Sequence, residues 1–113
     1  ASDVYKRQEI MSRTRLPTAI IAGNDRCALG ILDVFTRAGI DIPGEVSLVG
    51  YDDSRLSDNP RIDLTTIHQD AEAMGRNAVR LAVEMLDGTQ PARPDHVLEP
   101  SLKVRGTTGP PRG

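Results

Sequence analysis

The sequence has little of what several classes of protein require. It contains no tryptophan, one phenylalanine, two tyrosines and a single cysteine, Cys27, in 113 residues. A lone cysteine cannot form an internal disulfide, and Cys27 has no Cys or His partner at the spacing of a zinc site. We therefore expect no disulfide framework, no metal site and no cofactor, and a reducing, cytoplasmic setting.

The sequence also lacks a basic excess and a long apolar run. Its 14 Lys and Arg residues are outnumbered by 16 Asp and Glu residues, whereas a duplex-binding module is expected to carry clustered positive charge. The longest apolar stretches, such as residues 18–22, are too short to span a bilayer, and residues 1–16 have no signal-peptide core. The composition thus predicts one soluble domain, or a piece of one, that does not itself grip DNA or enter a membrane.

The first half of the chain shows a strand, a helix and a second strand. Residues 18–22 form an apolar run that stops at Gly23, and residues 46–49 form another that stops at Gly50. Between them, residues 24–38 carry apolar side chains at helical spacing, with Asn24 as a cap and Gly39 as a stop. An interval of this size predicts two parallel strands with the helix on one face of the sheet.

The second half predicts a loop, a strand, a helix and a less regular end. Residues 51–63 are polar and have no apolar period, residues 64–67 read as a strand, and residues 70–87 read as a helix capped by Asp70. Short strands are expected at 96–98 and 102–104. The segment from Gly106 onward is expected to fray.

Two polar residues stand where ligands of open α/β folds usually bind. Asn24 and Asp52 each follow a predicted parallel strand at its carboxyl end, where the sheet opens a crevice. A carboxylate such as that of Asp52 accepts two hydroxyl hydrogen bonds, and the Asn24 amide both donates and accepts, which suits a sugar. The alternatives are a helix cap for Asn24 and a turn-forming role for Asp52.

Three separated stretches resemble one family in order and spacing. They are residues 17–25 (PTAIIAGND), 46–53 (VSLVGYDD) and 64–70 (LTTIHQD), and together they are similar to the effector domain of LacI/GalR repressors. The resemblance covers residues 9–108, sets apart an unmatched segment 1–8, and leaves 109–113 as a flexible tail. It implies part of a three-layer α/β fold with a parallel sheet, of the periplasmic-binding-protein-like type I, in which two subdomains enclose the ligand cleft.

The resemblance also implies roles for particular residues. Asn24, Asp52 and Gln69 match effector contacts, although Gln69 is equally well read as a solvated residue before a helix. The first helix and the acidic loop match dimer contacts, for which Cys27, Ala28, Leu29 and Leu56 are the candidates. DNA would be bound only by a helix-turn-helix segment that is not part of this sequence.

Other polar residues fit solvated surface better than chemistry. Asp53 and Arg55 lie in a loop with many charges, where exposure is the default and a dimer contact is the sharper alternative. His68 has no partner at metal spacing, and no nucleophile with a base or phosphate loop is present. We therefore expect no enzyme. A sugar-responsive repressor is favoured over a periplasmic sugar-binding protein that feeds an importer.

Overall fold

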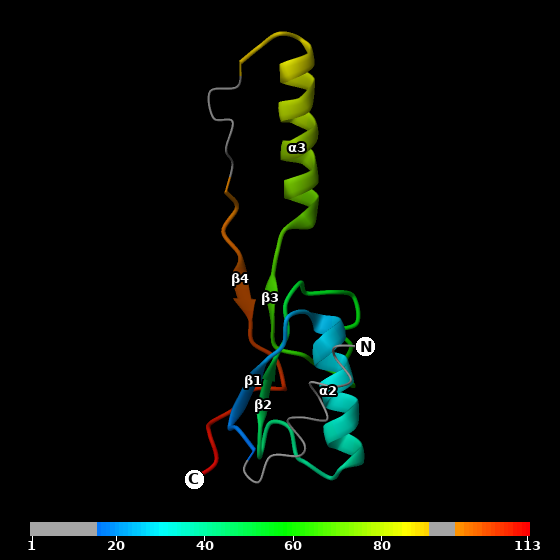
Figure 1. The fold of residues 1–113 in the computed structure, drawn as a ribbon, viewed down its shortest axis with the longest axis vertical. Coiled ribbons are helices and arrows are strands. Elements are labelled where there is room, and N and C mark those ends of the chain that lie inside the picture. The colour runs from blue at the N-terminus through cyan, green and yellow to red at the C-terminus, as the bar shows by residue number, and fades with distance from the viewer. Residues whose placement is uncertain (1–15, 91–96) are drawn as a thin grey trace. The chain divides into compact units, whose positions relative to one another are not determined.

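A computed structural model describes residues 16–90 and 97–113. Its elements, in chain order, are β1 (Ala19–Ile21), α2 (Asp25–Arg37), β2 (Ser47–Val49), β3 (Thr66–His68), α3 (Ala71–Leu86) and β4 (Ser101–Lys103) (Figure 1). They belong to two compact units, of which the first joins the chain up to His68 to Leu102–Gly113. The second unit is Gln69–Ser101.

The first unit is built on a pair of parallel strands. β1 pairs with β2 so that Ala19 faces Ser47 and Ile21 faces Val49, and α2 runs beside the pair (Figure 1). Parallel strands need a crossover connection such as this helix, because a tight turn would leave the second strand antiparallel to the first. The predicted α/β class with a parallel sheet is confirmed.

A small core fills the space between α2 and the sheet. The bulkiest fully buried apolar side chains are Phe35 from the helix, Leu48 from β2 and Leu64 from the segment before β3. Ile21 of β1 lies outside this core and is 79% exposed. The described residues thus supply two of the three expected layers, one helix and one sheet.

Local signals set the ends of α2. The Asn24 side chain accepts a hydrogen bond from the Cys27 N–H at 2.8 Å, which satisfies one of the free donors at the start of the helix. At the other end Gly39 has a φ of 76°, a left-handed conformation that glycine adopts without steric cost. The predicted helix, 24–38, is confirmed with its two caps.

The third strand starts later than predicted. The sequence predicts residues 64–67, whereas β3 spans Thr66–His68 and Leu64 is a buried residue ahead of it. The segment of β3 lies beside the residues that follow β2. The Gly50 N–H donates to the Thr65 carbonyl and the Asp52 N–H donates to the Ile67 carbonyl, both at 2.9 Å. β4 then lies beside β3 in a two-stranded sheet (Figure 1).

The second unit is dominated by α3. The Asp70 side chain accepts from the Ala73 N–H at 3.0 Å, and Gly88 has a φ of 78° after the last turn, so the predicted helix is confirmed. No residue of α3 is buried. The expected strand 96–98 begins outside the described residues, and residues 97–100 are not a strand.

The end of the chain is ordered, which corrects the expectation of fraying. The Leu48 N–H donates to the Thr107 carbonyl at 2.8 Å, and the Gly109 N–H donates to Ser47 Oγ at 3.0 Å. Arg112 donates to the main-chain carbonyls of Leu16, Pro17 and Glu45. The segment therefore lies along β2 and supplies partners that β1 does not.

Candidate functional site

The carboxyl ends of β1 and β2 meet at one edge of the first unit. The Ala22 N–H donates to the Val49 carbonyl at 2.8 Å, and the Asp25 N–H donates to the Tyr51 carbonyl at 2.9 Å. The residues that follow the two strands are thereby held side by side. The structure brings Asn24 and Asp52 to this edge, as the sequence predicts.

Asp52 presents an exposed carboxylate at this edge. Its side chain is exposed and accepts no hydrogen bond from the residues that the structure describes. A turn-forming role would need the N–H two residues ahead, but the Ser54 N–H donates instead to Asp25 Oδ2 at 2.7 Å. The geometry therefore favours a ligand role for Asp52 over the turn.

Asn24 combines its two possible roles. Its Oδ1 atom caps α2, which leaves the amide nitrogen to donate to a bound molecule. The side chain is half-buried at the same edge as Asp52. Gln69, the third predicted contact, is half-buried and begins the second unit, where its carbonyl accepts from the Ala71 N–H at 2.9 Å.

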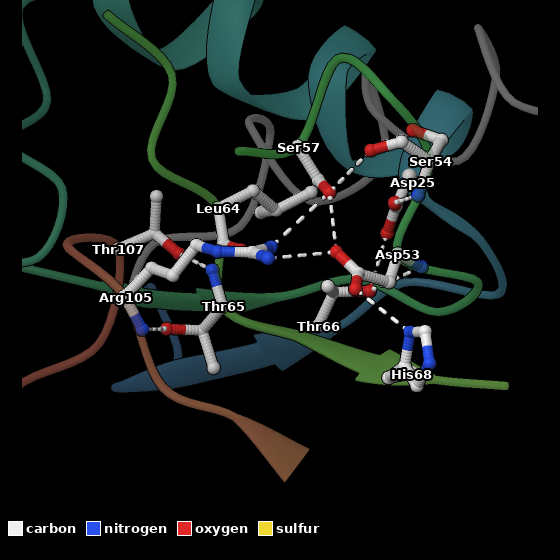
Figure 2. Close-up of polar contacts among 10 residues, drawn as sticks. All are labelled: Asp25, Asp53, Ser54, Ser57, Leu64, Thr65, Thr66, His68, Arg105 and Thr107. Carbon is white, nitrogen blue, oxygen red and sulfur yellow. Dashed lines mark hydrogen bonds and ion pairs between the residues drawn. The ribbon is translucent and has the colours of Figure 1, made fainter. Parts of the chain in front are cut away.

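A buried carboxylate lies behind the Asp52 loop. Asp25 is 2% exposed and accepts hydrogen bonds from Thr66 Oγ1 at 2.6 Å and from the Ser54 N–H (Figure 2). A Cβ atom on Gly50 would lie 2.3 Å from Asp25 Oδ1, so only glycine leaves room for this carboxylate. The sequence predicts for Asp25 only a favourable place at the start of the helix, whereas it also ties β1, β3 and the loop together.

The loop backbone is held in an uncommon conformation. Asp52 and Asp53 have φ values of 115° and 55°, which non-glycine residues rarely adopt. Each N–H in this stretch has a fixed acceptor: Asp52 donates to the Ile67 carbonyl at 2.9 Å, and Asp53 donates to Thr66 Oγ1 at 3.3 Å. These bonds, with that of Ser54 to Asp25, hold the main chain of the loop at Asp52 in place.

Asp53 is not the solvated loop residue that the sequence suggests. Its side chain is only 14% exposed, and its carboxylate accepts from Arg105 at 2.8 Å and Ser57 at 3.0 Å and pairs with His68 Nδ1 at 2.9 Å (Figure 2). Burial opposes ionisation of this carboxyl, yet the hydrogen bonds from Arg105, Ser57 and His68, with the charge of Arg105, bring its pKa below the ordinary 3.8. Arg55, by contrast, is exposed as expected.

Arg105 is the residue that sequence reasoning missed. It donates to the Leu64 carbonyl at 3.0 Å and to Ser57 Oγ at 3.1 Å as well as to Asp53. No local pattern marks it, because its partner Asp53 lies 52 positions earlier in the chain. A partly buried guanidinium with several partners within the protein organises structure rather than binding an anion from solvent.

The site offers recognition rather than catalysis. Among residues 16–90 and 97–113 no three His, Cys, Asp or Glu side chains are grouped to hold a metal ion. His68 pairs with Asp53 and faces no nucleophile, whereas the Asp52 carboxylate and the Asn24 amide provide an acceptor and a donor. Such a pair suits a neutral polyhydroxylated molecule.

The predicted dimer residues differ in accessibility. Leu56 is 55% exposed, and Cys27 and Leu29 are half-buried. Ala28 is fully buried in the core of its own chain, so it has no surface to offer a partner. Within the described part of the chain no helix is both long and apolar enough to cross a membrane.

Comparison with known proteins identifies the family. Residues 1–108 match the model of the periplasmic binding protein-like domain. A curated relative is the HTH-type transcriptional regulator MalR of Streptomyces coelicolor, 40% identical over 91 residues. That match covers 80% of this chain and 26% of the relative, so the chain spans about a quarter of that protein.

Solved structures agree with this match. A dimeric Lac repressor with an 11-residue C-terminal deletion superimposes with a TM-score of 0.89 at 31% identity, covering 98% of this chain and 40% of that one. The transcriptional regulator CelR in complex with cellobiose gives a TM-score of 0.82 at 35% identity, covering 94% and 32%.

These relatives are transcriptional regulators, which favours a regulator over an importer component and confirms the expectation of a domain that is not an enzyme. Transcriptional regulators of this family are cytoplasmic, which agrees with the expected setting. The chain belongs to the periplasmic-binding-protein-like family, as part of the effector-binding domain of a LacI-family transcriptional regulator.

Proposed function

We propose that this chain senses a small sugar-like effector for a homodimeric repressor whose DNA-reading segment lies outside the sequence. The observation that carries the proposal is the exposed Asp52 carboxylate at the same strand edge as the Asn24 amide, with no hydrogen bond from residues 16–90 or 97–113. Its two oxygens can accept hydrogen bonds from vicinal hydroxyl groups of a sugar, and the Asn24 amide can donate a hydrogen bond to a ring or hydroxyl oxygen. Gln69 is the third candidate contact.

The known complexes of relatives support this ligand class. CelR was solved with cellobiose, and a Lac repressor with ONPG, and both resemble this chain over more than nine-tenths of its length. A curated repressor of arabinose metabolism is 39% identical over 101 residues. For this chain we propose a sugar or glycoside as the effector, which a binding screen would identify.

Binding of the effector would act on DNA indirectly. In a homodimer, closure of each ligand site changes the relative placement of two DNA-reading segments, which must match half-sites about one helical turn apart. The acidic balance of this chain, with a net charge of −2, is consistent with a sensing part that leaves the phosphates to another segment.

The test is calorimetry on the intact regulator against cellobiose, arabinose and a panel of further sugars. For the sugar that binds, Asp52→Ala should weaken affinity by about 1–3 kcal/mol, the scale of hydrogen bonds to a charged group. Asp52→Asn keeps a residue type that tolerates positive φ and should show a similar loss if charge is what matters.

Asp58→Ala is the matched control, because Asp58 is an exposed aspartate of the same loop. It should bind the sugar as the unmodified protein does. Unchanged affinity in both Asp52 variants would remove Asp52 from the site, and binding of no sugar in the panel would overturn the proposed ligand class.

A further inference from the structure

The chain passes between its two units twice. It leaves the first unit after His68, at the end of β3, and it re-enters at Leu102, within β4. At these two crossings the main chain joins one unit to the other. Residues that hold both of them therefore matter for transmitting a ligand signal.

The side chain of Asp53 contacts the chain near both crossings. Asp53 Oδ2 pairs with His68 Nδ1 at 2.9 Å, where the chain leaves, and Asp53 Oδ1 accepts from Arg105 at 2.8 Å, three residues after the chain returns (Figure 2). The two carboxylate oxygens thus have different partners. They face segments that are separated in sequence by the whole second unit.

The contact on the returning segment is made by several hydrogen bonds of Arg105. Arg105 also donates from its side chain to the Leu64 carbonyl and to Ser57, and its main-chain N–H donates to Thr65 Oγ1 at 2.9 Å. Its side chain is 18% exposed and that of Asp53 is 14% exposed. Charge-assisted bonds so poorly exposed to water are screened less than surface ion pairs and hold geometry more firmly.

Asp53 is also the direct neighbour of Asp52. Both residues have positive φ, and their N–H groups are bonded to β3 at Ile67 and Thr66. A shift of the Asp52 main chain therefore cannot leave Asp53 where it is. One peptide unit separates the exposed carboxylate from the one that holds the crossings.

We propose that Asp53 is a positioning residue that couples the effector loop to both chain crossings. The effector role of Asp52 in this coupling rests on the proposed function, whereas the hold of Asp53 on the two crossings does not. Effector contact at Asp52 shifts Asp53, and Asp53 moves the end of β3 and the segment after β4 together. Asp53 touches no effector itself.

Hydrogen exchange on the intact regulator, without effector, tests the hold directly. Asp53→Ala should speed amide exchange in residues 64–68 and in residues 102–106 by at least about tenfold, as expected when hydrogen bonds to a charged group are lost. Exchange in α2 should be unchanged. A merely structural role would instead speed exchange throughout the first unit.

Single-arm variants make the test specific. His68→Gln should speed exchange at the end of β3 but not after β4, and Arg105→Gln should speed exchange in residues 102–106 and at Leu64. Asp33→Asn is the control, because Asp33 pairs with Arg37 on the exposed face of α2 and faces neither crossing. Asp53→Asn, which keeps the shape of the side chain, provides a second reading if Asp53→Ala does not fold.

The proposal is overturned if the Asp53 variants leave exchange in both crossings unchanged or speed it at only one of them. Uniform acceleration across the first unit would overturn it equally. Because no sugar is present, neither result depends on Asp52 binding one, and failure of the proposed function would appear only in the calorimetry.

Discussion

Asp52 and Asp53 are the same residue type at adjacent positions, with opposite environments. The Asp52 carboxylate is exposed and accepts no bond from the described residues, whereas that of Asp53 is committed to Arg105, Ser57 and His68. Both residues have positive φ, 115° for Asp52 and 55° for Asp53. Two adjacent aspartates can therefore differ in role, and the residue type alone does not distinguish the exposed carboxylate from the paired one.

The lowered pKa of Asp53 predicts a stability contribution that depends on pH. A carboxyl with a lower pKa in the folded than in the unfolded chain stabilises the fold above the ordinary value of 3.8, and this stabilisation is lost as the pH falls through the folded pKa. Urea unfolding should therefore show the unmodified protein more stable than Asp53→Asn at neutral pH. The difference should shrink as the pH falls below the ordinary value.

His68 and Arg105 are the charged or titratable groups that face Asp53. The pH series is therefore repeated in a His68→Gln background, so that the imidazole does not contribute. If the difference in stability caused by Asp53→Asn stays constant from neutral pH to strong acid, the prediction is contradicted, because proton binding by Asp53 then does not change on unfolding.

Among the elements, the C-terminal segment departs most from expectation. Thr107 is 4% exposed, and its hydroxyl donates to the Leu48 carbonyl at 2.7 Å while accepting from the Thr65 N–H at 2.9 Å. A single side chain thus joins the end of the chain to β2 and to the residue before β3. The segment acts as a component of the sheet although it has no regular strand there.

Thr107→Val keeps the buried shape but removes both hydrogen bonds. The Leu48 carbonyl and Thr65 N–H then lose a buried partner, which should lower the free energy of unfolding by about 1–3 kcal/mol in denaturant titrations. Thr36→Val is the matched control, because Thr36 is exposed on α2 and its hydroxyl donates to the Leu32 carbonyl of the same helix. A loss at Thr107 no larger than that at Thr36 would show that the segment adds little.

The helices can be predicted from sequence because their signals are local. Asn24 and Asp70 cap their helices through N–H groups three residues ahead, and Gly39 and Gly88 end them. The start of β3 cannot be predicted in this way. Leu64 has the side chain of a typical strand residue, but it is a buried core residue that precedes the first residue of β3.

The same distinction applies to the site. The position of Asn24 and Asp52 at the sheet edge can be predicted because strand ends mark that edge, and a strand end is visible in the sequence. The Asp53–Arg105 pair spans 52 positions and the Thr65–Thr107 bond 42, and neither has a local signature. The loop and the C-terminal segment both look solvated in the sequence for this reason.

In the whole molecule, the proposed dimer can be tested by charge. Leu29 and Leu56 remain candidates for the interface, since one is half-buried on α2 and the other is 55% exposed in the acidic loop. On a two-fold axis a lysine at either position meets its own copy, so Leu29→Lys or Leu56→Lys should shift the full-length protein from dimer to monomer.

Sedimentation at low micromolar concentration is the measurement. Thr18→Lys, at an exposed position before β1, is the control and should remain dimeric. If both leucine variants also sediment as dimers, the interface lies elsewhere on the molecule.

The late position of the segment 102–113 has a consequence for synthesis. Thr65 is paired with a hydroxyl made 42 residues later, and the Leu16 carbonyl with a guanidinium made 96 residues later. At about 5–20 residues per second, a ribosome leaves the Thr65 amide waiting roughly 2–8 s for its partner. During that interval α3 has already emerged, while β2 still has an open edge. A nascent chain of this protein is therefore exposed to strand pairing with its neighbours on a polysome until residues 102–113 arrive.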